Sequence, residues 1–263
     1  MHKTLNTAAV TAALRHKDFH LLTAAETGST NDDAKTLAAG GAPQFTVVQA
    51  EYQTKGKGRL GRSFYSPSGT GLYFSIILRP TDLPIEDTLF ITTAAAAAVA
   101  EAVEAVCGKT CGIKWVNDLF LEGRKICGIL TEAAFRPDLT GLEYAVLGIG
   151  VNIAPPVGGF PKDLQAIANT IYDDPARVPD DLREHLLAAI LDHFYDYYTQ
   201  FPKKAFLESY RSRSILTGKA VTVHRGDQQY PARVIGIDDR CRLLVEQDDI
   251  VTPLDSGEVS IRF

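Results

Sequence analysis

The segment QTKGKGRLGR, residues 53–62, lies between two predicted strands and is the most distinctive stretch of the chain. Residues 46–50 (TVVQA) and 72–78 (LYFSIIL) are both predicted to be short buried strands. Glycine allows the backbone to approach a ligand closely, and lysine and arginine bind phosphate or carboxylate groups. A long connection between two strands of a compact region is usually functional or disordered. The segment therefore predicts an anion-binding loop, with a solvated, flexible basic loop as the alternative.

Composition restricts the classes of protein to consider. The chain has 263 residues and 45% hydrophobic content, enough for one large core, or for a core and a small second domain. A net charge of −5 argues against a protein that mainly coats nucleic acid. Four scattered cysteines suggest a reducing compartment, so we expect a cytoplasmic protein. No run approaches the roughly 18 apolar residues that span a bilayer, so we expect no membrane segment.

The first third of the chain predicts a strand at 18–25, a helix at 32–39 and a long helix at 86–106. Between the first two lies the sequence GSTN, residues 28–31. One of its polar side chains is sufficient to cap the helix, so two remain for another role. A purely structural cap and a binding function are both open at this point. The alanine-rich helix at 86–106 is predicted to pack closely against a sheet.

The middle of the chain predicts a strand at 112–116 (GIKWV), a hairpin of 119–121 with 125–132, and a buried strand at 143–151. Lys114 stands in an apolar strand, where an unpaired ammonium group is costly, so we expect a function for it. A lysine at a sheet edge with its amine in solvent is the alternative. Gly128, inside a strand, suggests a bulge or the close approach of a ligand.

After Gly218, the spacing of apolar residues changes from that of helices to that of short strands. Helices are predicted at 162–169, 180–201 and 203–214, and five short strands follow at 220–224, 230–237, 242–246, 250–253 and 259–263. Such a series of short strands predicts a small β-barrel. We therefore expect an α+β protein in which residues 1–215 form a mixed sheet with helices and residues 216–263 form a second domain.

Six motifs in this order resemble those of biotin protein ligases: GSTN (28–31), EYQTKGKGRLGR (51–62), SPSGTGLYFS (66–75), KWVNDL (114–119), GRKICGILTE (123–132) and LGIGVN (147–152). The resemblance extends from about Phe19 to the C-terminus. It implies a catalytic domain like those of class II synthetases and an SH3-like C-terminal domain. Fewer than twenty residues precede the first predicted strand, so we expect no DNA binding through an N-terminal winged helix.

The resemblance implies that ATP activates biotin to biotinyl-5'-AMP and that a lysine of a biotin carboxyl carrier protein then takes the biotinyl group. Mg²⁺ is the implied cofactor and Asp118 its candidate ligand, and the protein is expected to be a monomer or a homodimer. The implied catalytic residues are Lys114, Arg59 and Arg62. The implied biotin-binding residues are Ser29, Thr30, Asn31, Gln53, Gly56, Lys57, Arg59, Lys114 and Gly128. The implied ATP-binding or adenylate-binding residues are Gly58, Arg59, Gly61, Arg62, Phe64, Asn117 and Asn152.

The chain departs from the family pattern at four positions. Lys57 replaces an arginine of the usual loop, Val116 replaces a proline, and Phe64 replaces a tryptophan. Ile235 stands where an arginine is expected, so a contact between the C-terminal domain and the nucleotide is in doubt. Two other functions are considered, a lipoate protein ligase and a non-catalytic sensor of biotin or nucleotide. The compact basic loop and the small barrel favour biotin, and the presence of Lys114 with the arginines argues against a sensor.

Overall fold

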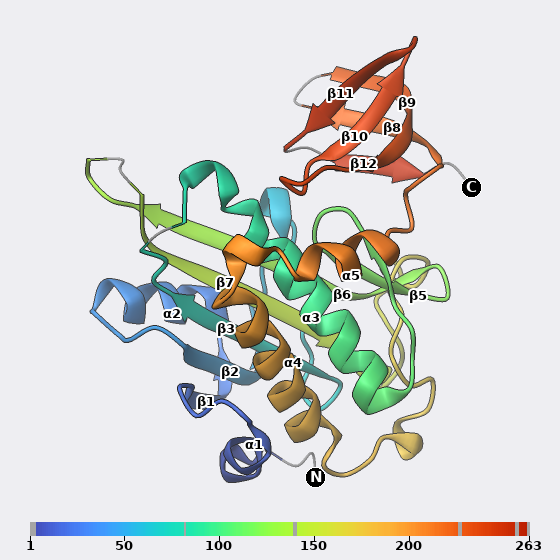
Figure 1. The fold of residues 1–263 in the computed structure, drawn as a ribbon. Coiled ribbons are helices and arrows are strands. Elements are labelled where there is room, and N and C mark those ends of the chain that lie inside the picture. The colour runs from blue at the N-terminus through green and yellow to red at the C-terminus, as the bar shows by residue number, and fades with distance from the viewer. Residues whose placement is uncertain (1–3, 82, 139–140, 226–227, 256–257, 262–263) are drawn as a thin grey trace.

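The computed structural model describes residues 4–81, 83–138, 141–225, 228–255 and 258–261 (Figure 1). A seven-stranded sheet forms the centre of the larger domain, with strand order β1-β2-β3-β7-β6-β5-β4. β1 runs parallel to β2, and the other neighbouring pairs are antiparallel. The strands are β1 (His20–Thr27), β2 (Thr46–Gln53), β3 (Gly71–Leu78), β4 (Gly112–Lys114), β5 (Asp118–Leu121), β6 (Arg124–Phe135) and β7 (Leu142–Asn152).

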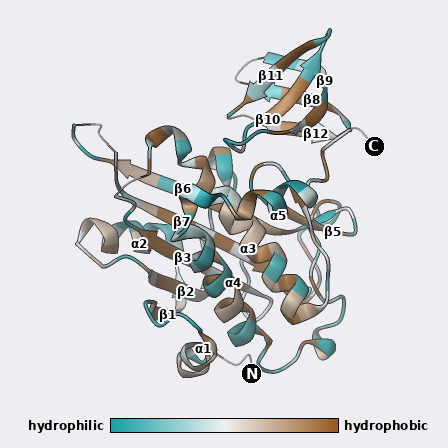
Figure 2. Ribbon diagram, in the orientation of Figure 1, coloured by the Kyte–Doolittle hydropathy of each residue, from teal (hydrophilic) through white to brown (hydrophobic). Residues whose placement is uncertain are grey.

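Helices α3 (Leu89–Cys107) and α4 (Leu182–Tyr198) cover one face of this sheet, and α1 (Thr7–Ala13) packs against α4. Side chains alternate between the two faces of a strand, so one set of each strand points into this core. Figure 2 shows the hydrophobic residues along β2 and β3 beneath the helices. The alanines of α3 from position 94 to 102 are fully buried, and their small side chains let the helix lie close to the sheet.

Helix α3 is long and apolar enough to cross a membrane, judged by length and composition alone. The expectation that no run approaches this length is therefore wrong for its 19 residues. However, 72% of its apolar window is buried inside the protein. Burial of this kind is typical of the core helix of a globular protein, and the contacts of α3 with α4 and β6 agree with that interpretation.

The opposite face of the sheet is only partly covered. Helix α2 (Thr30–Ala39) packs Ala34 and Ala38 against apolar side chains of β2, β3 and β7. Beyond α2, Gly150 of β7 pairs with Gly128 of β6, and Gly148 of β7 pairs with Leu130. A strand with glycines at alternate positions has no side chains on one side, so this part of the face is a shallow depression.

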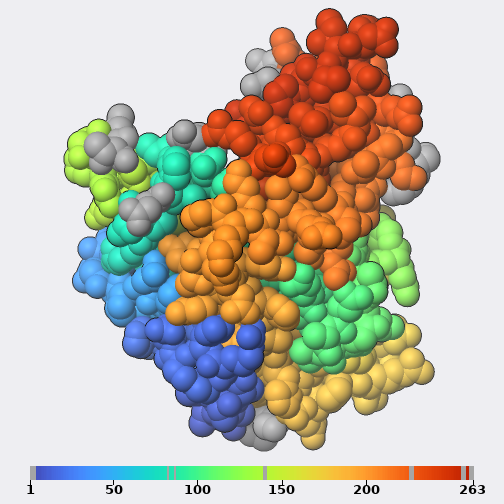
Figure 3. All heavy atoms as spheres, viewed as in Figure 1, coloured from blue at the N-terminus to red at the C-terminus, as the bar shows by residue number. Residues whose placement is uncertain are grey.

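The C-terminal domain is an antiparallel sheet in the order β11-β10-β9-β8-β12. Its strands are β8 (Ala220–Arg225), β9 (Gln228–Ile237), β10 (Leu243–Gln247), β11 (Ile250–Leu254) and β12 (Glu258–Ile261). Helix α5 (Phe206–Ser212) lies between the two sheets, and the C-terminal domain projects from one end of the molecule (Figure 3). The α+β fold with a mixed sheet and a small C-terminal β domain is thus confirmed. Short 3₁₀ helices complete the chain: η1 (Arg59–Gly61), η2 (Ile85–Asp87), η3 (Pro175–Arg177) and η4 (Phe201–Lys203).

One predicted helix is absent from the structure, and one observed helix was not predicted. The helix predicted at 162–169 is wrong, because this segment forms turns. Its backbone groups instead pair with β6, where Lys125 N donates to Ile167 O and Asn169 N donates to Lys125 O. Helix α1 was not predicted. Asn6 caps it by accepting hydrogen bonds from two backbone N–H groups, and an asparagine before an alanine-rich run was the available signal.

Candidate functional site

A small cavity lies on the glycine-rich face of the seven-stranded sheet, beside the N-terminus of α2. Its volume is about 30 Å³. It brings together residues from α2, the end of β2, the basic loop, β6 and β7. The lining residues are Ser29, Thr30, Asn31, Gln53, Lys57, Phe64, Phe74, Gly128, Leu130, Gly148, Ile149 and Gly150. Six of the residues implied for biotin and one implied for the adenylate are therefore neighbours in space.

The GSTN segment supplies buried polar groups to this cavity. Ser29 is the N-cap residue of α2, but its side chain makes no capping hydrogen bond. Thr30 N and Thr30 Oγ1 both donate to Gln53 Oε1, at 2.9 and 3.1 Å. Ser75 Oγ lies 2.8 Å from Thr30 Oγ1 and 2.6 Å from Asn31 Oδ1. The side chains of Thr30 and Asn31 therefore belong to a buried hydrogen-bond network beside the cavity, and a binding role for them stays a prediction.

Asn31 is hydrogen-bonded to Glu132, which belongs to a chain of ion pairs. Asn31 Nδ2 donates to Glu132 Oε2 at 2.8 Å, and Lys35 Nζ lies 2.8 Å from Glu132 Oε1. Lys35 also pairs with Asp32 at 3.0 Å, and Asp32 in turn pairs with Lys57 of the basic loop. The network thus connects the loop to α2 and to β6.

The two carboxylates of this network remain ionised at neutral pH. Burial alone would raise the pKa of Glu132, but hydrogen bonds from Lys35 and Asn31 outweigh it and lower the pKa. Burial opposes the same shift at Asp32, where hydrogen bonds from Lys57 and Lys35 lower the pKa. The negative charges therefore fix both lysines and the amide of Asn31.

The basic loop folds back on itself. Isolated bridges pair Gln53 with Ser66 and Lys57 with Ser63, and Gly58 N donates to Arg62 O at 2.7 Å. A Cβ atom at Gly56 would lie 2.3 Å from Phe64 O, so the close approach of the two arms requires glycine there. The turn uses left-handed backbone conformations, with φ of 55° at Leu60 and 74° at Gly61.

Phe64 occupies the depression over the glycines. A Cβ atom at Gly150 would lie 2.5 Å from its ring, and one at Gly128 would lie 3.2 Å away. The remaining cavity has space for about one water molecule, whereas sites for small organic ligands measure about 300–1,000 Å³. Binding of such a ligand therefore requires the ring of Phe64 to move.

Besides Lys57, which lines the cavity, two lysines beside Asp118 are candidates, and only Lys114 was selected from the sequence. Lys125 Nζ is 2.7 Å from Asp118 Oδ1 and 3.1 Å from the position of a Cβ atom at Gly128. Lys114, the last residue of β4, pairs with Asp118 in the sheet, and its ammonium lies 5.9 Å from the ring centre of Phe120. The structure thus adds Lys125 to the candidate residues. The signal was the motif GRKICG, but a register shift between Leu119 and Phe120 determines which way this lysine faces.

The remaining predicted residues are not among those that line the cavity. Asn117 is buried, and its Oδ1 accepts a hydrogen bond from Arg59 Nη1 at 3.1 Å. Asn152 ends β7 two residues after Gly150, so the two residues share a face of the strand. Its Nδ2 donates to Asn169 O at 3.1 Å. Arg62 forms the end of the loop turn, with its backbone N–H donating to Arg59 O.

The donor groups allow only a limited metal site. No group of three or more His, Cys, Asp or Glu side chains that could hold a metal ion occurs within the described ranges of the chain. Asp118 Oδ1 is buried, and apart from Lys125 no hydrogen-bond partner is present for it among the described residues. Mg²⁺ is often bound by one or two carboxylates together with substrate phosphates and water. Asp118 fits one ligand of such an ion, and phosphates would have to supply others.

The cysteines do not provide a nucleophile at this site. Burial raises the pKa of Cys107 to about 11 and that of Cys111 to about 12. Burial also raises the pKa of Cys127, a fully buried residue of β6. These thiols are protonated at neutral pH, and a thiol is unreactive in that form.

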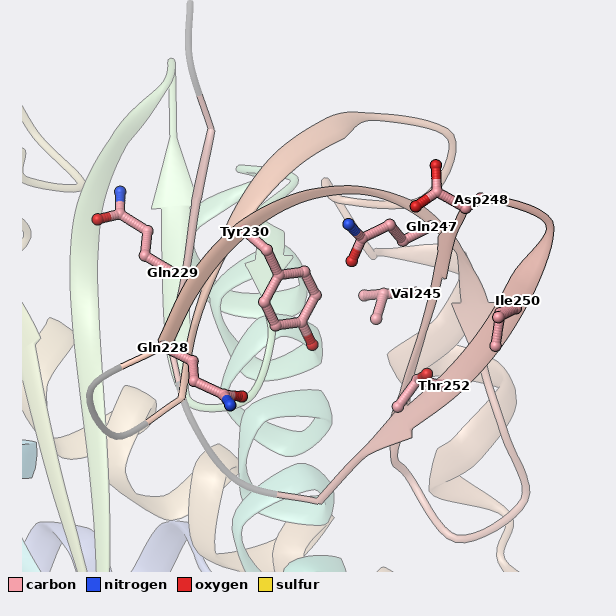
Figure 4. A pocket seen from close by; sticks show the side chains of 8 residues that line it. All are labelled: Gln228, Gln229, Tyr230, Val245, Gln247, Asp248, Ile250 and Thr252. Carbon is pink, nitrogen blue, oxygen red and sulfur yellow. The ribbon is translucent and has the colours of Figure 1, made fainter.

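A second hollow of about 640 Å³ lies on the C-terminal domain (Figure 4). Tyr230 and Gln228 of β9 lie opposite Ile250 and Thr252 of β11. Among the described residues that line it there are one acid, Asp248, and no lysine or arginine. The smaller cavity in the larger domain, which Lys57 lines, is therefore the better candidate for recognition of an anion.

Two family profiles match this chain. That of the biotin/lipoate A/B protein ligase family matches residues 26–152, which include the GSTN segment, the basic loop and the glycine-rich strands. That of the biotin protein ligase C terminal domain matches residues 216–262. Both profiles agree with the resemblance inferred from the six motifs.

Individual relatives extend over most of the chain. The bifunctional ligase/repressor BirA of Bacillus spizizenii is 32% identical over 246 residues, covering 92% of this chain and 74% of that protein. The biotin–[acetyl-CoA-carboxylase] ligase of Mycobacterium tuberculosis is 31% identical, covering 89% and 86%. The structure of the Aquifex aeolicus biotin protein ligase in complex with biotin and ATP superimposes with a TM-score of 0.77 at 27% identity, covering 92% and 98%. The chain belongs to the biotin protein ligase family.

Proposed function

We propose that this protein activates biotin with ATP to biotinyl-5'-AMP and transfers the biotinyl group to a lysine of a biotin carboxyl carrier protein. The observation that carries the proposal is the union of three features on one sheet face. These are a buried polar network, a floor of glycines and a cation-rich loop. The relatives from Mycobacterium tuberculosis and Aquifex aeolicus support the choice of biotin and ATP.

The polar network fits the ureido end of biotin, whose carbonyl and N–H groups need partners when buried. Ser29, Thr30, Asn31 and Gln53 would supply these partners. The glycines at 128, 148 and 150 would form the floor for the apolar ring and tail, since any side chain there would fill the space. Phe64 would leave this floor when biotin enters and then pack over the adenylate.

The cations would bring two anions together. In the first step, a carboxylate oxygen of biotin bonds to the α-phosphorus of ATP, while the bond from that phosphorus to the bridging oxygen breaks and pyrophosphate leaves. Lys125, Lys114, Arg59 and Arg62 would reduce the repulsion and stabilise charge on the phosphoryl oxygens. Gly56, Lys57, Gly58 and Gly61 would shape the loop around the ligand. Asn117 and Asn152 would contact the nucleotide.

In the second step, the ε-amine nitrogen of the acceptor lysine bonds to the acyl carbon of biotinyl-AMP, AMP leaves with the electrons of the broken acyl–oxygen bond, and the proton lost by the amine passes to the departing phosphate or to solvent. The closed loop would keep water away from the mixed anhydride until the acceptor arrives. Mg²⁺, with Asp118 as one ligand, would neutralise charge on the phosphates. We propose residues 1–215 as the catalytic domain, residues 216–263 as the second domain, and a cytoplasmic monomer or homodimer.

The two alternative functions are a lipoate protein ligase and a non-catalytic sensor. The family profile over residues 26–152 includes lipoate ligases, whereas the match to the biotin protein ligase C terminal domain favours biotin. A sensor would bind biotin or nucleotide without chemistry.

A pyrophosphate-release assay with ATP and either biotin or lipoate separates the three functions. Release with biotin, followed by labelling of a biotin carboxyl carrier domain, is expected. Release with lipoate instead would assign a lipoate ligase, and biotin binding without pyrophosphate release would assign a sensor.

A further inference from the structure

Two side-chain hydrogen bonds hold the peptide segment just before Asn117, and both come from outside the cavity. Tyr210 Oη of α5 donates to Val116 O at 3.0 Å. Trp115 Nε1 donates to Cys241 O at 2.9 Å. Tyr210 is fully buried and Trp115 is 4% exposed. Neither residue lines the cavity, so their hydrogen bonds do not recognise a ligand directly.

Cys241 belongs to the C-terminal domain, in the turn between β9 and β10, and this turn is fixed to the larger domain. Arg211, which follows Tyr210 in α5, donates from Nε to Ile237 O at 2.8 Å and from Nη2 to Asp239 Oδ1 at 2.7 Å. Cys241 is fully buried, and its Sγ accepts a hydrogen bond from Thr93 Oγ1 of α3 at 3.3 Å. Figure 1 shows α5 between the two sheets. Tyr210 of this helix bonds to Val116 of the larger domain and Arg211 bonds to Ile237 of the C-terminal domain, and we call these contacts, together with the Trp115–Cys241 hydrogen bond, the joint.

The held segment leads directly to Asn117. The amide of Asn117 accepts from Arg59 Nη1 through Oδ1 and donates from Nδ2 to Ile129 O at 2.8 Å. A displacement of the peptide group of Val116 would therefore move Asn117 Oδ1, which accepts the hydrogen bond from Arg59. Through this hydrogen bond the joint is connected to the basic loop.

We infer that Tyr210 and Trp115 are positioning residues for the ligase reaction. Each fixes one of the two peptide units before Asn117, so that the amide of Asn117 holds Arg59 in place over the acyl-adenylate. Through Trp115, the C-terminal domain acts on the loop without contacting the nucleotide. The inference rests on the proposed function, and it adds that Arg59, as part of the closed loop, retains biotinyl-AMP.

The test uses Tyr210→Phe in the full-length protein, because this change removes one oxygen atom and keeps the ring. Free biotinyl-AMP released during turnover and the labelling of a bystander protein are measured with ATP and biotin. Loss of one buried neutral hydrogen bond corresponds to roughly a two- to tenfold increase in release. Trp115→Phe, which removes the indole donor at the other anchor, is expected to increase release in the same way.

The control is Tyr198→Phe at the end of α4, which removes a hydroxyl bonded to Gln44 Oε1 at 3.0 Å rather than to Val116 O or Cys241 O. It is expected to lower the melting temperature by a similar amount and to leave release unchanged. If the two anchors act through Asn117, adding Tyr210→Phe to Asn117→Ala should increase release no further.

Three results would overturn the inference. The first is release by Tyr210→Phe and Trp115→Phe no greater than that by Tyr198→Phe, while Arg59→Gly releases the adenylate. The second is a full additive effect of Tyr210→Phe in the Asn117→Ala background. The third is retention of biotinyl-AMP by Arg59→Gly, which would also refute the proposed role of Arg59. Absence of adenylate synthesis in the wild-type protein is a separate result and would refute the proposed function itself.

Discussion

Gly148→Ala is expected to damage the biotin site through Asn31, its closest neighbour across the cavity. An added Cβ atom would lie 2.0 Å from Asn31 Oδ1, so the amide must move by more than an ångström. Asn31 cannot do so and keep its hydrogen bonds to Ser75 Oγ at 2.6 Å and Glu132 Oε2 at 2.8 Å. The first is worth about 1 kcal/mol and the second, to a charged group, about 1.5–3 kcal/mol.

These contributions are coupled and Glu132 is partly exposed, so we expect the free energy of unfolding to fall by about 2–3 kcal/mol. For a chain of this size, that is a decrease in melting temperature of about 4–12 °C. Biotin should bind about 5- to 150-fold more weakly, because its buried ureido group loses a partner worth about 1–3 kcal/mol. Differential scanning calorimetry and titration calorimetry with biotin measure the two effects.

Gly236→Ala is the matched control, since nothing lies within 4 Å of a Cβ atom at that position of β9. It should leave biotin affinity unchanged. A Gly148→Ala protein that loses stability as expected but binds biotin within twofold of the wild type would show that Asn31 does not contact biotin. An unchanged melting temperature would refute the packing argument at its first step.

Three further expectations can be checked with the same protein. Lys125→Met should reduce biotin-dependent pyrophosphate release by about 10²–10³-fold, and a larger loss in Lys114→Met would restore Lys114 as the principal phosphate-binding lysine. Phe64→Ala should bind biotin about fivefold faster, because ring displacement costs about 1 kcal/mol. Stopped-flow mixing with a fluorescent biotin analogue follows this step, and an unchanged rate would contradict occlusion by Phe64, with Tyr65→Ala as the exposed control. The pKa values of Asp32 and Glu132 in the folded protein are lower than their usual values of 3.8 and 4.5. Each ionised carboxylate therefore stabilises the fold fully above its usual pKa, and this contribution is lost as the pH falls through the lowered pKa. Urea unfolding should therefore show a stability advantage of the wild type over Glu132→Gln that is constant from about pH 7 to 5 and disappears below about pH 4, and an advantage that grew on acidification would contradict the assigned shifts.

Much of the site could be predicted because its chemistry lies in short contiguous motifs. The segments GSTN and QTKGKGRLGR are each followed or preceded by a clear strand or helix pattern, so their polar residues could be placed at element ends. The order of the motifs then identified the family and the mixed sheet with its small C-terminal domain. The ring of Phe64 approaches Gly128 closely, and the approach of a ligand to this glycine stays a prediction.

What could not be predicted depends on contacts between distant segments. The direction of Lys125 follows from a register shift in β5 and β6, which no local pattern specifies. Residues 162–169 have helical composition, yet their backbone pairs with Lys125 of a strand formed earlier in the chain. The joint of Tyr210, Trp115 and Cys241 depends on two hydrogen bonds to backbone carbonyl groups, and their partners lie 126 and 94 residues apart in the sequence. A carbonyl group has no signature in a sequence.

The two faces of β7 should differ in their tolerance to substitution. Leu147, Ile149 and Val151 point into the helix-covered core, where one aliphatic side chain can replace another of similar volume at small cost. Gly148 and Gly150 point to the ligand face, where the smallest possible addition already collides with Asn31 or Phe64. Tolerance to substitution along this strand should therefore alternate with every residue. A saturation library selected for biotinylation would record that alternation as a period of two, with the intolerant positions marking the ligand.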